Sequence, residues 1–97
     1  MASSNTVVPG MAMAKQLNGV TYFFAQSDRR SAAGATFTFS LEGLGGKTAR
    51  IIYDSDTQYD PSNSSLGATI GLDGSGLFSD VLGANGDDYQ VKIYAIQ

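Results

Sequence analysis

Three aspartates crowd into one short polar segment and are the side chains best suited to holding a metal ion. Asp54, Asp56 and Asp60 lie in this segment together with Ser and Asn. Carboxylate, hydroxyl and backbone carbonyl oxygens are the ligands that calcium prefers in proteins. An EF-hand is excluded, because the sixth position counted from Asp54 is Tyr59 instead of glycine and the twelfth is Ser65 instead of glutamate. The sequence therefore leaves two interpretations, a calcium site at the three aspartates or a solvated acidic loop, and it predicts no other cofactor.

The residue types that carry most enzymatic chemistry are missing. The chain has no histidine and no cysteine, which removes the commonest general base, the thiolate nucleophile and disulfides. A carboxylate pair could hydrolyse a glycoside. However, Glu42 and the eight aspartates all lie in predicted turns or strand ends, where no apolar cleft raises a carboxyl pKa. We expect no catalytic activity.

Three tyrosines, one on the last predicted strand and two in or beside the aspartate-rich segment, offer a different chemistry, the binding of sugars. If residues 90–96 form a strand, Val91, Ile93 and Ala95 share one face, and Tyr94 shares the other with Gln90 and Lys92. An aromatic ring beside hydrogen-bonding side chains can hold a sugar through C–H contacts and hydroxyl hydrogen bonds. The predicted sugar contacts are therefore Tyr94, Tyr53, Tyr59, Gln90 and Lys92. The alternative is that these tyrosines cover the core, and the absence of tryptophan favours it.

The elements that position these side chains are short strands. Residues 35–41 alternate fully between apolar and polar side chains, which indicates a half-buried strand. Residues 20–26 are more continuously apolar, which suits a strand covered on both faces or one with aromatics on its outer face. Asn18-Gly19 between residues 12–17 and 20–26 predicts a hairpin with a type I′ turn. Further strands are expected at the ranges 48–53, 66–72, 77–81 and 89–96.

These elements predict an all-β fold, a two-sheet antiparallel β-sandwich of seven or eight strands. The 97 residues suffice for one domain, and 12 glycines supply the turns that many short strands need. We expect one β-sandwich domain over residues 13–97. Residues 1–12 are expected to be a flexible N-terminal segment or a first edge strand.

Charge and hydropathy narrow the choice of partners. The net charge is −3, and Arg29-Arg30 is the one adjacent basic pair, so no nucleic-acid partner is expected. No apolar run approaches the roughly 20 residues of a membrane span, so no membrane partner is expected either. The N-terminus does not read as a signal peptide, because it lacks a basic region followed by an apolar stretch.

The order of several short motifs resembles a known family. Residues 14–25 combine a lysine, a glycine turn and an aromatic strand, and a Thr-Phe-Thr strand (35–41) and Gly43-Leu44 follow. Phe78-Ser79-Asp80 precedes a closing Tyr-x-Val-x-x-Tyr-x-Ile run at residues 89–96. This succession, from Met13 to Ile96, resembles the small C-terminal β-sandwich domain that follows the (β/α)8 barrel of many microbial glycoside hydrolases. Residues 54–72 depart from it and look like an insertion.

The resemblance implies an accessory role without catalytic residues. Domains of this family pack against the catalytic barrel, and some relatives serve as carbohydrate-binding modules. Our leading hypothesis is therefore a polysaccharide-binding module of a secreted or periplasmic carbohydrate-active enzyme. The alternatives are a purely structural domain that packs against its parent barrel and a β-domain that associates with itself through edge strands. One contiguous exposed apolar patch would favour docking, whereas a groove carrying the tyrosines would favour sugar.

Overall fold

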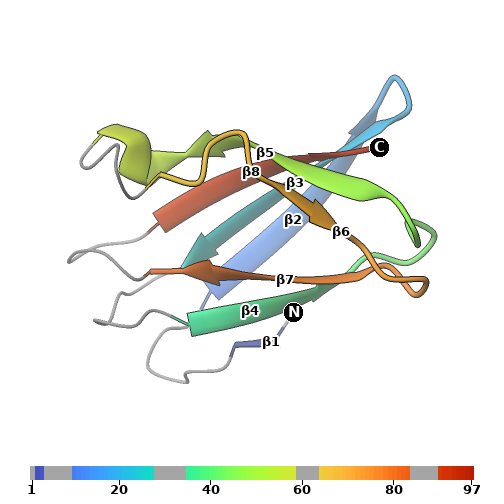
Figure 1. Cartoon of the computed structure of the whole chain (residues 1–97), viewed down its shortest axis with the longest axis horizontal. Coiled ribbons are helices and arrows are strands. Elements are labelled where there is room, and N and C mark those ends of the chain that lie inside the picture. The colour runs from blue at the N-terminus through green and yellow to red at the C-terminus, as the bar shows by residue number, and fades with distance from the viewer. Residues whose placement is uncertain (1, 4–9, 28–34, 59–63, 84–89) are drawn as a thin grey trace.

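The structure is a computed structural model that describes residues 2–3, 10–27, 35–58, 64–83 and 90–97. It consists of two antiparallel sheets, which confirms the predicted all-β sandwich (Figure 1). The strands are β1 (Ala2–Ser3), β2 (Gly10–Leu17), β3 (Val20–Ser27), β4 (Ala35–Ser40), β5 (Thr48–Asp54), β6 (Thr69–Gly71), β7 (Leu77–Leu82) and β8 (Gln90–Ile96). One 3-10 turn, η1 (Ser55–Gln58), follows β5.

The larger sheet has the order β2-β3-β8-β5-β6, and the smaller has the order β1-β4-β7. The last strand of the chain, β8, therefore lies in the middle of the larger sheet, between β3 and β5 (Figure 1). A central strand has neighbours on both edges, so its side chains must face either the smaller sheet or the outer surface of the larger one. This position decides the role of every residue on β8.

The predicted hairpin is confirmed. Asn18 and Gly19 both have positive φ, at 53° and 82°, as a type I′ turn requires. Leu17 pairs with Val20, and the register continues to Gly10 and Ser27, so both strands are longer than predicted. The hairpin tip projects past its neighbouring strands at the upper right of Figure 1.

Aromatic rings from both sheets fill the core. Phe23 and Phe39 pack edge to face with centroids 4.8 Å apart, and Phe78 packs on Tyr94 at 5.1 Å. Such pairs add roughly 0.5–1.5 kcal/mol each beyond the area they bury. The buried apolar residues are Phe23, Ala25, Ala35, Phe37, Phe39, Ala49, Ile51, Leu72, Phe78, Leu82, Tyr94 and Ile96. The alternation predicted for residues 35–41 is thus correct, and β3 carries its remaining aromatics, Tyr22 and Phe24, half-buried on the outer surface.

Two turns at the end of the sandwich opposite η1 meet backbone to backbone. Leu41 N–H donates to the carbonyl of Gly76 at 2.9 Å, and Gly46 N–H donates to that of Asp73 at 2.9 Å. A Cβ on Gly76 would collide with the Leu41 carbonyl, and one on Gly45 would collide with that of Gly74. Glycine at 45 and 76 therefore allows the close approach that closes this end of the sandwich.

Candidate functional site

The side chains predicted to bind sugar on β8 lie inside the sandwich. Tyr94 is 0% exposed, and Gln90 and Lys92 are each 4% exposed. Val91, Ile93 and Ala95, which share the opposite face of the strand, are half-exposed on the outer surface. An exposed sugar-binding face is therefore wrong for Tyr94, Gln90 and Lys92, and the alternative, in which Tyr94 covers the core, is correct for this tyrosine.

The pairing of β8 with β3 explains why Tyr94 and Lys92 face the core instead of solvent. Tyr94 pairs with Phe23 and Lys92 pairs with Ala25, and both partners on β3 face the core. Cross-strand partners share a face, so Tyr94 and Lys92 face the core as well. Both faces of β8 carry apolar side chains. The polar side chains on its inner face can be buried because residues of other strands form hydrogen bonds or an ion pair with them.

An ion pair satisfies Lys92. Its Nζ lies 3.0 Å from Asp80 Oδ2, and it also donates to the Val81 carbonyl at 3.0 Å. The Tyr94 hydroxyl donates to the same carboxylate oxygen at 2.7 Å. Burial, together with the negative charge of Asp80, raises the pKa of Tyr94 far above its usual value, so the phenol stays neutral and donates.

Asp54 organises the neighbouring part of the interior and is 2% exposed. Oδ1 accepts hydrogen bonds from Asp56 N–H and Gln90 Nε2, both at 2.9 Å. Oδ2 accepts from Ser65 N–H at 2.9 Å and from the Ser65 hydroxyl at 2.8 Å. Burial alone would raise the pKa of Asp54, but these hydrogen bonds outweigh it and hold the pKa below its ordinary value. Asp54 is therefore an ionised anchor that ties β8 and Ser65 to the end of β5.

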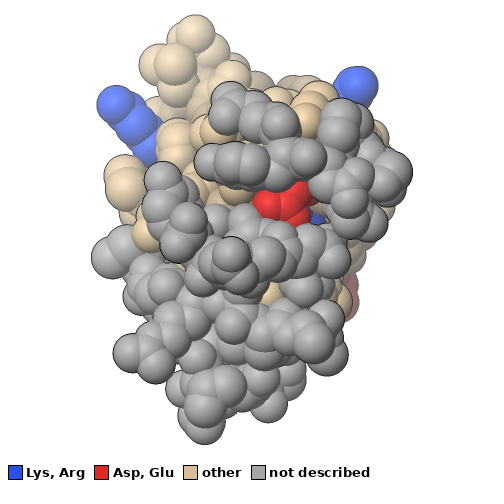
Figure 2. Space-filling model, turned by 90° about the vertical axis from the view of Figure 1, so that its left-hand side faces the viewer, with Lys and Arg blue, Asp and Glu red and all other residues tan. Residues whose placement is uncertain are grey.

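Gln90 extends this network across the sandwich. Its Oε1 accepts from Gly83 N–H at 2.8 Å, and its own N–H donates to Ser27 Oγ at 3.1 Å. Val91 N–H donates to Ser55 Oγ at 2.9 Å. Figure 2 views this end of the molecule and shows acidic atoms in the middle of it, with basic atoms beside them.

This geometry gives Asp54 a role that neither of the two interpretations, a calcium site or a solvated acidic loop, describes. Four hydrogen-bond donors occupy its two oxygens, which leaves no lone pair directed at a cation. Within the described ranges, no three Asp, Glu, His or Cys side chains come together to hold a metal. Asp60 and Tyr59, the other two predicted site residues of this segment, lie outside the described residues.

The surface open to partners is the other side of the larger sheet, which we call the outer face. Met13 is 61% exposed and Tyr53 is 40% exposed, so Tyr53 is the predicted sugar contact that the described part of the chain leaves accessible. The side chains of the outer face are Met13, Lys15, Leu17, Val20, Tyr22, Phe24, Gln26, Thr48, Arg50, Ile52, Tyr53, Thr69, Val91, Ile93 and Ala95.

The outer face has an apolar half on β2, β3 and β8. Met13 pairs with Phe24 and Phe24 pairs with Ile93, so the three side chains form one row across the strands. A hollow of about 310 Å³ lies beside this row, between Met13, Phe24 and Val91. Tyr53 pairs with Ile93 and continues the row onto β5. These residues make one contiguous apolar surface that reaches solvent.

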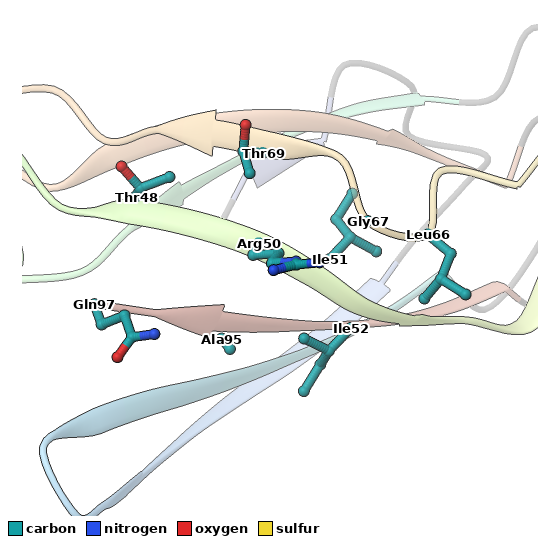
Figure 3. Close-up of a pocket in the computed structure, with 9 residues that line it drawn as sticks. All are labelled: Thr48, Arg50, Ile51, Ile52, Leu66, Gly67, Thr69, Ala95 and Gln97. Atoms are coloured by element: carbon teal, nitrogen blue, oxygen red, sulfur yellow. The ribbon is translucent and has the colours of Figure 1, made fainter.

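The other half of the outer face, on β5 and β6, carries more polar side chains, although Ile52 and Leu66 are also exposed there, and we call it the polar half. A hollow of about 600 Å³ opens there over Ala95, and Figure 3 shows Arg50, Thr48, Thr69 and Gln97 around it. Lys15 and Arg50 lie on one cross-strand row, through Tyr22 and Ala95. The described residues of the outer face include no Asp or Glu, so this face is locally positive on a chain of net charge −3.

Sequence reasoning missed Met13, Phe24 and Ile93 as surface residues. One signal pointed to them. In residues 20–26 and 91–96, apolar side chains occur on both faces of the strand. One face packs in the core, so the apolar side chains of the other face must lie on the outer surface.

The described residues contain no helix long and apolar enough to cross a membrane. In comparisons with known proteins, the chain matches no family model, no curated protein and no solved structure.

Proposed function

We propose that this chain is a non-catalytic accessory module that packs the apolar half of its outer face against the (β/α)8 barrel of a secreted or periplasmic carbohydrate-active enzyme. The single observation that carries the proposal is the row Met13, Phe24, Ile93 and Tyr53, which crosses four strands and reaches solvent. A contiguous apolar surface on a small domain marks a contact with another protein more often than a site for a polar ligand.

The proposed occupant is a barrel surface that is apolar and carries carboxylates. Lys15 and Arg50 flank the apolar row and meet no acidic side chain on the described outer face. Complementary charge at the rim of an apolar contact sets the register and speeds association. The resemblance to domains that follow a glycoside-hydrolase barrel supports the same binding partner. The lack of a catalytic role is supported by the missing histidine and cysteine and by Asp54 and Asp80, which are held in internal hydrogen bonds.

Met13→Asp is expected to weaken binding of the chain to the separately produced catalytic domain of its parent polypeptide at least tenfold. A charge placed in an apolar contact is costly to bury. Met13 is 61% exposed, so the substitution leaves the fold of the free chain intact. The measurement is isothermal titration of the two domains.

Val81→Asp is the matched control, because Val81 is an exposed apolar strand residue on the other sheet. It should bind as the unaltered chain does. Equal weakening by both substitutions, or a natural polypeptide that holds no barrel domain, contradicts the docking proposal.

Sugar binding is a second candidate, and Tyr53 is the observation that favours it. Tyr53 is 40% exposed on β5, the strand that also carries Thr48 and Arg50 into the polar hollow. An exposed aromatic ring on the same strand as hydroxyl and guanidinium donors offers both kinds of contact that a sugar ring uses. Tyr53 also belongs to the apolar row proposed to dock, so a sugar and the barrel would compete for this side chain.

Tyr53→Ala is expected to abolish any retardation of the chain in affinity electrophoresis through a panel of soluble polysaccharides. Loss of one stacked ring costs an exposed site about 1–3 kcal/mol by analogy with other aromatic stacking platforms, roughly ten- to a hundredfold in affinity. Tyr53→Phe keeps the ring and should preserve retardation, and Leu77→Ala on the opposite sheet should not change it. If no glycan retards the unaltered chain, this candidate is removed, and the docking proposal is unaffected.

A further inference from the structure

The edge of the larger sheet at β2 is long and open. β2 pairs with β3 over all eight of its residues, and no strand pairs with its other side among the described residues. Every described side chain from Ala12 to Leu17 is exposed, on both faces of the strand. A free edge of this length is a template for another strand, and most proteins shield such edges with charge, proline or a covering loop.

The hairpin geometry shows which backbone groups are free. A two-residue type I′ turn makes Leu17 and Val20 a hydrogen-bonded pair, and such pairs alternate along an antiparallel ladder. The N–H and C=O groups of Met13 and Lys15 therefore point at β3. Those of Ala12, Ala14 and Gln16, and of Gly10 before them, point away from the sheet.

The space beside this edge is also open. The smaller sheet does not extend over β2, so Ala12, Ala14 and Gln16 are exposed although they face the core side. Two hollows of about 310 and 320 Å³ lie between the core side of β2 and Ser40, which ends β4. Small side chains at 12 and 14 keep the approach to the free backbone groups clear.

We propose that β2 pairs antiparallel with β2 of a second copy of this chain, which joins the two larger sheets into one. A two-fold axis at Met13 uses all four residues with free groups, since Ala12 then pairs with Ala14 of the other copy and Gly10 with Gln16. The two Met13 side chains meet at the axis and remove exposed apolar surface from water.

The charge pattern fits this register. Lys15 is the one charged residue of β2, and it lies across from residue 11 of the other copy instead of from its own counterpart. Like charges directly opposite would destabilise the pair. Both outer faces end on the same side of the joined sheet, so Phe24, Ile93 and Tyr53 of each copy stay available for docking, whereas Met13 is shared with the contact between the copies.

The test is sedimentation velocity of the isolated chain between roughly 10 µM and 1 mM, because a single strand pair is far smaller than a standard interface and associates weakly. The mass is expected to rise with concentration from 10.1 kDa toward twice that value. Ala14→Pro removes a free N–H and no bond to β3, so it should stay monomeric. Ala14→Val keeps the N–H and should associate as the unaltered chain does.

Amide hydrogen exchange provides the second readout and needs no variant. Raising the concentration is expected to slow exchange at Ala12, Ala14 and Gln16, and to leave Met13 and Lys15 slow throughout. A chain that is monomeric over the whole range overturns the proposal, and so does a folded Ala14→Pro variant that associates normally. Neither result bears on docking, because both are measured without the barrel.

Discussion

Asp54→Ala is expected to lower the free energy of unfolding by about 3–5 kcal/mol, the largest effect of any single substitution considered in this chain. The change leaves two buried donors, Asp56 N–H and Gln90 Nε2, and both donors of Ser65 without their acceptor. For a domain of this size, 1 kcal/mol corresponds to roughly 4–8 °C, so the melting temperature should fall by roughly 12–40 °C. Chemical denaturation monitored by tyrosine fluorescence measures the effect.

The ionisation of Asp54 also predicts an acid-dependent loss of stability. Its pKa in the folded state is lowered from the ordinary value of 3.8, so the unfolded chain binds the proton more readily. The stabilisation is therefore fully present above about pH 4 and is lost as pH falls through the folded-state pKa. Asp54→Asn should flatten the dependence of unfolding free energy on pH below about 4.

Glu42→Gln is the matched control for this pH dependence, because it removes the same charge from an exposed residue. It should leave the slope unchanged. If the unfolding free energy of Asp54→Asn still falls steeply at acid pH, another carboxylate causes the pH dependence. A melting temperature of the unaltered chain that rises with millimolar calcium would contradict the role of Asp54 as an internal anchor, since a ligand of the folded state must stabilise it.

Lys92→Met is expected to destabilise the chain by about 3 kcal/mol, with a drop in melting temperature of roughly 12–24 °C. Methionine keeps the aliphatic volume but removes the cation, which leaves the Asp80 carboxylate in the sandwich without its counter-charge. The Tyr94 hydroxyl still donates to that carboxylate and limits the loss. Thermal unfolding followed by circular dichroism gives the shift.

A double-mutant cycle separates the ion pair from packing. Asp80→Asn combined with Lys92→Met should cost less than the sum of the two single changes, because the pair is coupled across a 3.0 Å contact. Lys47→Met, at an exposed position, should change stability by no more than about 0.5 kcal/mol. Strictly additive effects of Asp80→Asn and Lys92→Met would contradict the buried ion pair.

The fold was predictable because its signals are local. Alternation at residues 35–41 and the Asn18-Gly19 turn each follow from the chemistry of a few neighbouring residues, and the structure agrees with both. The face of β8 was not predictable in the same way. Both faces of β8 carry apolar side chains. Which face turns to the core depends on the pairing of β8 with Phe23 and Ala25, which lie far away in the chain.

The polar residues of the interior show the same limit. A lysine and a glutamine on a strand ordinarily indicate the solvent side, because burying them without partners is costly. Here Asp80 and Asp54 supply the partners, and no local pattern indicates that β7 and the end of β5 bring them to β8. The aspartate-rich segment allowed a calcium site or a solvated loop, and neither describes Asp54, because oxygen ligands for a cation and acceptors for buried donors are the same residue types.

Hydroxyl-radical footprinting of the chain with and without the proposed barrel domain tests most directly the proposal that the outer face is the docking surface. We expect protection of Met13, Phe24 and Tyr53 when the barrel domain is present, unchanged labelling of the opposite sheet at Leu77 and Val81, and no labelling of Tyr94 in either sample. Labelling of Tyr94 in the free chain, or protection of Leu77 and Val81 with Met13 left open, would contradict it.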